Sequence, residues 1–164
     1  MNQTLLAVAI FCGLSCIAPA RSTVLSPASD AESAQAELLA LHQADRRAHF
    51  SYDVNALVGS LPPELIYVRD GKIERQTQDA MRKGLTEYFA RAEFTAWDDL
   101  EPPIIRVSPD GRMGWMVVRM KLAYTETDSA GKKTPVETVM AWMSAYEKRD
   151  GKWLRVANTT TVQP

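Results

Sequence analysis

The dipeptide Asp-Gly occurs three times in this chain, in "VRDGKI" at 68–73, "SPDGRM" at 108–113 and "KRDGKW" at 148–153. A two-residue turn between antiparallel strands needs positive φ at both central positions, and Asp-Gly is one of the pairs that adopt it. The residues after the three pairs are unrelated, so they do not define a repeat. None of them opens a glycine-rich loop onto a helix, which argues against a phosphate-binding loop. The three pairs therefore mark strand junctions.

Helical patterns dominate the first half of the chain. Good helix formers fill residues 31–51 without a single Gly or Pro, which predicts one long helix. Asp53 is the expected N-cap of a short second helix that ends before Pro62. Thr77 can cap a third helix, in which Met81 and Leu85 begin an apolar stripe at helical spacing.

The second half of the chain reads as strands. Asp70-Gly71 joins the strands of a hairpin at 64–75, and β-rich segments follow the third helix. These segments span 93–108, 112–127, 134–148 and 152–163. Short turns between them predict an antiparallel meander, in which Pro102 and Pro103 must lie at an edge, a bulge or a strand start. Helices followed by an antiparallel sheet predict an α+β fold.

The first twenty residues differ from the rest. "LLAVAIFCGLSCIAPA" is apolar and uncharged and ends in small residues, which is typical of a signal peptide cleaved after Ala20. Residues 1–20 are therefore predicted to be a signal peptide, 21–31 a linker and 32–162 the domain, in a protein that is periplasmic or secreted. The alternatives are an uncleaved anchor and a lipoprotein anchored through Cys16. Cys12 and Cys16 are the two cysteines of the sequence, so cleavage would leave no thiol for a disulfide, a nucleophile or a metal.

Charge and hydropathy exclude two classes of partner. The formal net charge is −1, so no basic excess attracts nucleic acid. Beyond the N-terminal segment no apolar run approaches the roughly 18 residues that a membrane-spanning helix needs. We therefore expect neither nucleic acid nor membrane as a partner once the signal peptide is removed, and the sequence indicates no cofactor.

Three local patterns resemble the SnoaL-like domains of the nuclear-transport-factor-2-like superfamily. They are "YDVNAL" after the long helix, "LIYVRDGKI" leading into a helix that ends "EYFARA", and "YEKRDGKWLRVANTTT" near the end of the chain. The resemblance covers residues 32–162. It implies a cone in which a curved antiparallel sheet wraps the long N-terminal helix and encloses a pocket, and it implies a homodimer formed through the sheet. The superfamily includes isomerases, dehydratases, hydrolases and members without known activity, so the fold does not determine the function.

The catalytic residues of the steroid-isomerase branch do not carry over. That branch has a Tyr on the long helix, where this chain has Asp45, and an Asp on the first strand, where Arg69 or the turn residue Asp70 stands. The later acid of the branch falls near Met143 and Ser144. The sequence therefore does not predict proton transfer of that type.

The long helix carries the candidate chemistry. His42, Asp45 and His49 fall on the same stripe as Leu38, which in the cone would face the pocket. In one interpretation the histidines are core residues, and Asp45 forms a hydrogen bond with one of them. In the other, Asp45 orients a histidine that acts as a general base or donates to a ligand, with His49 the candidate base and His42 a candidate ligand-binding residue. We predict no metal site, because His42 and His49 lie two turns apart.

Four further residues are candidates for ligand binding. Trp142 lies on a strand that is apolar on both faces and is therefore central. Tyr67 and Asn158 are polar residues on predicted strands. Arg119 would bind a carboxylate if it pointed inward, whereas alternation also allows it to lie on the outer or dimer face.

Two main functions remain open. The first is a binding module that holds a small apolar or carboxylate-bearing molecule in the cone. The second is an isomerase, dehydratase or hydrolase with His49 and Asp45 as an acid–base pair, which requires a cavity that reaches His49. An interaction role through the sheet is a third.

Overall fold

The order of helices and strands agrees with the sequence prediction. The structure is a computed structural model and describes residues 27–163. Its helices are α1 (Pro27–Ser51), α2 (Val54–Gly59) and α3 (Gln78–Phe89). Its strands are β1 (Glu64–Arg69), β2 (Lys72–Thr77), β3 (Ala92–Asp99), β4 (Ile104–Val107), β5 (Met113–Thr127), β6 (Lys133–Arg149) and β7 (Lys152–Val162). The predicted signal peptide and its cleavage site lie outside the described residues.

The long helix starts earlier than predicted. α1 begins at Pro27, so residues 27–31, which were assigned to the linker, are helical. Proline is well suited to the first helical position, because its φ is already helical and no N–H is needed there. Asp30 therefore lies in the first turn, where a negative charge complements the helix dipole.

The end of α1 is formed by a left-handed residue. Tyr52 has φ 56°, the N–H of Asp53 donates to the carbonyl of Ala48 at 2.9 Å, and the N–H of Tyr52 donates to that of His49 at 3.3 Å. These two bonds are those of a Schellman motif. The Asp53 side chain then caps α2 by accepting from the N–H of Ala56, as predicted.

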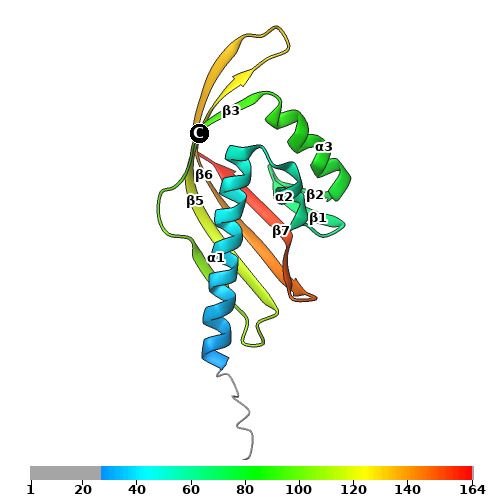
Figure 1. Cartoon of the computed structure of the whole chain (residues 1–164), viewed down its shortest axis with the longest axis vertical. Coiled ribbons are helices and arrows are strands. Elements are labelled where there is room, and N and C mark those ends of the chain that lie inside the picture. The colour runs from blue at the N-terminus through cyan, green and yellow to red at the C-terminus, as the bar shows by residue number, and fades with distance from the viewer. Residues whose placement is uncertain (1–26, 164) are drawn as a thin grey trace, which may run out of the picture.

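The strands form one curved sheet in the order β2-β1-β7-β6-β5-β3, with β4 also paired to β5. All neighbouring pairs are antiparallel except β1 and β7, which are parallel. Figure 1 shows α1 crossing one face of the sheet, with α2, α3 and the β1–β2 hairpin beside its upper half. The predicted α+β cone is confirmed, and β6 is central, as its two apolar faces indicated.

The segment at 93–108 is two strands, not one. β3 pairs with the second half of β5, whereas β4 pairs with the first half along the same edge. Pro102 and Pro103 lie between them. Two prolines remove two successive N–H donors, so the ladder along β5 cannot be continuous there.

Two of the three Asp-Gly pairs make the same turn. Asp70 and Gly71 have φ 51° and 71°, and Asp150 and Gly151 have φ 51° and 76°. Each joins strands that are separated by two residues, as predicted for a type I′ turn. In the pair at 110–111 only Gly111 has positive φ, because the loop between β4 and β5 is longer.

Two hydrophobic clusters fill the concave side of the sheet. The larger joins Ala34 and Leu38 of α1 to buried side chains of β3, β4, β5, β6 and β7. The smaller joins Val58, Leu61 and Leu65 to side chains of α3. α1 lies so close to β5 that a Cβ at Gly114 would come within 2.8 Å of Leu38 Cδ1.

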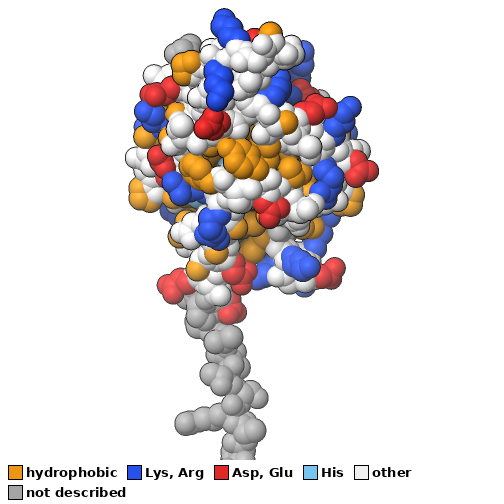
Figure 2. Space-filling view, turned by 45° about the horizontal axis from the view of Figure 1, so that its top comes forward, with side chains coloured by type: hydrophobic (Ala, Val, Ile, Leu, Met, Phe, Trp, Pro, Cys, Tyr) orange, Lys and Arg blue, Asp and Glu red, His pale blue; other side chains and the backbone are white. Residues whose placement is uncertain are grey.

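The outer face of the sheet carries apolar side chains that nothing in the described chain covers. Ile104, Trp115 and Met143 are 47, 36 and 42% exposed, and strand pairing places all three on this face. On the face seen in Figure 2, hydrophobic side chains also gather in the middle, inside a ring of charged ones. The homodimer stays a prediction, since a single chain does not test it.

Candidate functional site

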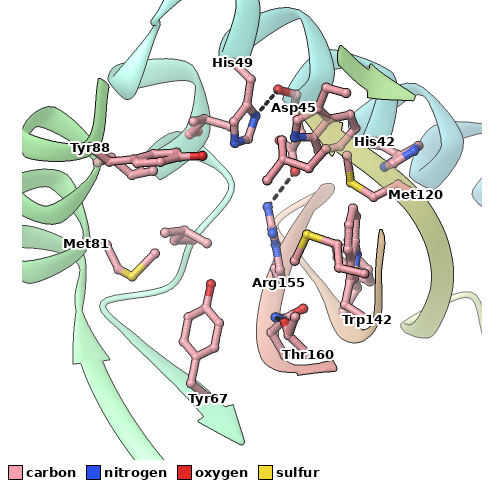
Figure 3. Close-up of a pocket in the computed structure, with 18 residues that line it drawn as sticks. His42, Asp45, His49, Tyr67, Met81, Tyr88, Met120, Trp142, Arg155 and Thr160 are labelled. Carbon is pink, nitrogen blue, oxygen red and sulfur yellow. Dashed lines mark hydrogen bonds and ion pairs between the residues drawn. The ribbon is translucent and has the colours of Figure 1, made fainter. Parts of the chain in front are cut away.

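A cavity of about 240 Å³ lies where the two hydrophobic clusters meet. The larger cluster contributes side chains such as Trp97, Met120 and Trp142 to its wall, and the smaller contributes Leu61 and Met81. Figure 3 shows the lining side chains converging from the helices and the strands. Six of the predicted site residues line the cavity, three from α1 and three from the strands. They are His42, Asp45, His49, Tyr67, Trp142 and Asn158.

The strongest polar contact in the cavity is an ion pair. Arg155 Nη2 donates to Asp45 Oδ2 at 2.6 Å, and the two side chains are 17% and 11% exposed. Burial alone would lower the pKa of Arg155, but the charge and hydrogen bond of Asp45, together with the nearby Tyr146 and Tyr67, outweigh burial, and the net shift of the pKa is upward. The guanidinium is therefore a permanent cation. Among the described residues its buried Nε has no hydrogen-bond partner.

A β-bulge brings Arg155 into the cavity. Between β6 and β7 the register runs Ser144 with Asn158 and Tyr146 with Arg155, so Val156 is the extra residue. Without the bulge, Arg155 and Asn158 would have opposite parity and point to opposite faces of the sheet. For this reason the sequence did not predict Arg155 as a site residue. The signal that could have indicated it is the position of an arginine among the apolar residues that follow the turn.

His49 is held by the main chain rather than by a carboxylate. Its Nδ1 lies 2.8 Å from the carbonyl oxygen of Asp45, so Nδ1 donates and carries the proton of the neutral ring. The ring centroid lies 5.1 Å from Trp97, 5.7 Å from Phe94 and 5.7 Å from Phe89. Burial among these rings lowers the pKa of His49. The imidazole is therefore neutral near pH 7, and Nε2 is left with a free lone pair.

His42 has a separate partner. Its Nε2 lies 2.9 Å from each carboxylate oxygen of Asp99 on β3, and only 4% of the residue is exposed. Its ring packs between Trp97 and Trp142, with centroid distances of 5.3 and 6.1 Å. His42 thus links the wall of the cavity to β3. It is a core histidine that packs against two tryptophans and forms its hydrogen bond with Asp99.

These contacts correct the predicted acid–base pair. The Asp45 carboxylate binds Arg155, and the contact between Asp45 and His49 uses the Asp45 carbonyl. At i, i+4 on a helix the histidine ring reaches the carbonyl four residues earlier, while the aspartate side chain at that position points toward the sheet. The Asp45 carboxylate is therefore not hydrogen-bonded to His49 in this geometry and acts on the ring only through space.

Tyrosines supply further polar groups. Figure 3 shows the hydroxyls of Tyr67 and Tyr88 pointing into the space that Arg155 also faces. Burial raises the pKa of Tyr88 and of Tyr146, so both phenols are neutral donors at physiological pH. Asn158 is already engaged, because its Oδ1 accepts from Ser144 at 2.7 Å and its Nδ2 donates to Thr160 at 3.0 Å.

Arg119 was wrongly included among the ligand-binding candidates. It is exposed and does not line the cavity. On β5 the inward positions are Met116, Val118 and Met120, which are at most 1% exposed, so Arg119 has the opposite parity and faces outward. The cation of the cavity is Arg155.

Within residues 27–163 no three His, Cys, Asp or Glu side chains are close enough to share a metal ion. None of the helices there is both long and apolar enough to span a bilayer.

The fold is shown by likeness to solved structures and not by likeness in sequence. No family model matches the sequence, and no curated protein matches it. Among solved structures, a protein of the nuclear transport factor 2-like (NTF2-like) superfamily from Salmonella enterica superposes with a TM-score of 0.65 at 14% identity, over 81% of this chain and 93% of that one. This chain has the NTF2-like fold.

Other solved structures with the NTF2-like fold are equally distant in sequence. One from Cytophaga hutchinsonii has a TM-score of 0.61 at 16% identity, over 77% of this chain and 95% of that one. A candidate dehydratase from Streptomyces avermitilis has a TM-score of 0.61 at 9% identity, over 81% and 99% of the two chains. At these identities the likeness establishes the NTF2-like fold and not an activity. The fold that the resemblance implied is confirmed by these structures.

Proposed function

We propose that this NTF2-like protein is an exported binding module that holds one small, largely apolar molecule with a polar end in its cavity. The observation that supports this most is the cavity itself, whose aromatic and aliphatic wall surrounds a single ion pair. Ligand sites typically combine an apolar lining with a few converging polar groups that set the orientation. Here Arg155, His49 and Tyr67 are those groups.

The apolar wall supplies most of the binding free energy in this proposal. Burying apolar surface contributes roughly 25 cal/mol per Å². A flat aromatic molecule would contact Trp97, Trp142 and Met81, and the thioether of methionine adapts to the shape of a ligand. The polar groups add orientation rather than affinity.

Filling the cavity tests the binding proposal. Leu85 lines it from α3, so Leu85→Trp should weaken binding of 2-acetylnaphthalene by at least ~10-fold in calorimetry, since about 1.4 kcal/mol is a factor of ten. Leu39→Trp is the matched control, because Leu39 is on α1 but exposed and outside the cavity. Undiminished binding to a folded Leu85→Trp variant would place the ligand elsewhere.

One observation favours an enzyme as the second candidate function. His49 is neutral near pH 7 and its Nε2 has a free lone pair beside the cavity, which suits a general base. In an isomerase, dehydratase or hydrolase, Nε2 would take a proton while Arg155 donates to the substrate oxygen. Asp45 would then act by holding both groups and not as the acid–base partner of His49.

Deuterium exchange distinguishes this second candidate from simple binding. The methyl protons of 2-acetylnaphthalene should exchange with D₂O faster in the presence of the protein, and His49→Gln should remove the acceleration while leaving binding within about threefold. Equal exchange rates with and without the native protein would leave only the binding module.

A further inference from the structure

We propose that the cavity selects uncharged ligands whose polar end is a carbonyl, amide or hydroxyl, and that Asp45 is the residue that rejects carboxylates. This inference rests on the proposed binding function and narrows it. The sequence left apolar and carboxylate-bearing ligands equally open. The charges that line the cavity distinguish these two classes of ligand.

The cavity has no free positive charge to offer an anion. Its ionisable lining groups are His42, Asp45 and His49 of α1, Tyr67 of β1, Tyr88 of α3, Tyr146 of β6 and Arg155 of β7. Arg155 is the one fixed cation, and the Asp45 carboxylate 2.6 Å away already balances it. Burial keeps His49 neutral by lowering its pKa, and it keeps Tyr88 and Tyr146 neutral by raising theirs.

A carboxylate ligand would have to compete with Asp45 for Arg155. Asp45 is 8% exposed, so water cannot stabilise its charge if the guanidinium turns away. If the guanidinium stays, two carboxylates share one cation in a poorly hydrated space. Juxtaposing like charges in a desolvated site typically costs several kcal/mol, which corresponds to ~100-fold or more in Kd.

A neutral polar group meets none of this repulsion. Asp45 binds one nitrogen of Arg155, Nη2, while the guanidinium lines the cavity and has five N–H donors in all. A carbonyl oxygen can accept from these donors or from the hydroxyl of Tyr67 or Tyr88. A ligand hydroxyl can donate to His49 Nε2, because Nδ1 is the protonated nitrogen. The site is therefore complementary to a neutral molecule with an acceptor, a donor or both.

The test uses 2-naphthamide and 2-naphthoate, which have the same shape and differ in charge. Calorimetry on the native protein at pH 7.5 should show 2-naphthamide binding at least ~10-fold tighter. Asp45→Asn keeps the shape of the side chain and removes its charge, so it should tighten 2-naphthoate binding at least ~10-fold and change 2-naphthamide by less than about threefold. Asp98→Asn, which removes a carboxylate from an exposed ion pair, is the matched control and should change neither.

A second measurement needs no variant, in case Asp45→Asn does not fold. In native protein the Kd of 2-naphthoate should rise roughly tenfold from pH 7 to pH 8, because only the protonated acid is accepted. The Kd of 2-naphthamide should stay constant over the same range, in which His49 remains neutral. A 2-naphthoate Kd that does not change with pH and lies within about threefold of the 2-naphthamide Kd would overturn the inference.

The outcomes separate the inference from the function on which it rests. If 2-naphthoate binds as tightly as 2-naphthamide and Leu85→Trp abolishes both, the binding function holds and the charge selection is wrong. If Asp45→Asn folds and 2-naphthoate gains nothing, Asp45 is not the discriminating residue. If neither probe nor 2-acetylnaphthalene binds to the native protein, the binding function itself is overturned.

Discussion

Asp45 and Arg46 are neighbours in α1, and each forms an ion pair with a β-strand, but the two pairs lie in different environments. Asp45 reaches Arg155 of β7 inside the cone, where both side chains are less than a fifth exposed. Arg46 reaches Asp98 of β3 at the surface, where the side chains are 45% and 56% exposed. One residue along a helix turns the side chain by about 100°, which is enough to separate a buried site from solvent. An ion pair of the same kind therefore affects folding stability and ligand choice inside the cone, and it contributes little to stability at the surface.

The largest expected effect comes from breaking the inner pair. Asp45→Ala leaves the Arg155 guanidinium buried without a carboxylate, which should lower the free energy of unfolding by roughly 3–5 kcal/mol. Asp98→Ala should lower it by less than about 1 kcal/mol, because water solvates the half-exposed Arg46 guanidinium that remains. Urea denaturation of the two variants measures the difference. Equal losses would mean that the inner pair is better hydrated than its burial indicates.

A double variant shows whether the loss comes from the unpaired charge. In Asp45→Leu with Arg155→Met both charges are gone, so this protein should be more stable than Asp45→Ala by about 2 kcal/mol or more. If the double variant is the less stable one, packing and not charge dominates the contribution of the pair. The double variant also removes the polar centre of the cavity.

The next effect is smaller, because it comes from the titration of one group, His49. It concerns how the free energy of unfolding depends on pH. The folded-state pKa of His49 is below its unfolded value of about 6.5, because burial disfavours the imidazolium. Below pH 6.5 the unfolded chain binds a proton that the folded chain does not, so stability is fully present above that pH and decreases as pH falls. The loss of stability between pH 7.5 and pH 5.5 should be smaller in His49→Gln than in the native protein. Identical pH profiles would show that His49 is not desolvated.

The smallest effect separates the two pairs by salt. Raising NaCl from 0.1 M to 1 M shortens the Debye length from about 10 Å to about 3 Å. The coupling between Arg46 and Asp98, measured by a double-mutant cycle, should fall from a few tenths of a kcal/mol to near zero. The coupling between Asp45 and Arg155 should change little, because the buried pair is poorly accessible to ions. Salt sensitivity of the inner pair would indicate an open cavity.

Local sequence patterns were sufficient for most of the architecture. The helices and the hairpin at Asp70-Gly71 follow from periodicity, caps and turn residues, which act over a few positions. The split between β3 and β4 was not predicted, although Pro102 and Pro103 mark it. The parallel pairing of β1 with β7 had no local signal, because it joins segments about 90 residues apart in the chain.

The residues of the candidate site also divide into those that local patterns predict and those that they do not. His42, Asp45 and His49 could be found because one helical period places them on one stripe. Their partners, Asp99 and Arg155, could not be found, because contacts across 57 and 110 positions depend on how the sheet curves around α1. Arg155 was not predicted because regular alternation, which can be read from a sequence, places it on the outer face, and the bulge that turns it inward cannot be read in that way.

The sequence by itself determined the elements, their order and which helix carries the polar residues of the core, since these depend on interactions between near neighbours. Only the tertiary structure decided that the Asp45 carboxylate neutralises Arg155 and that His49 keeps a free nitrogen at the cavity. The physical reason is the extra residue Val156 in β7, which reverses the alternation of the strand and turns one arginine inward. That inward turn places the fixed cation of the cavity next to Asp45.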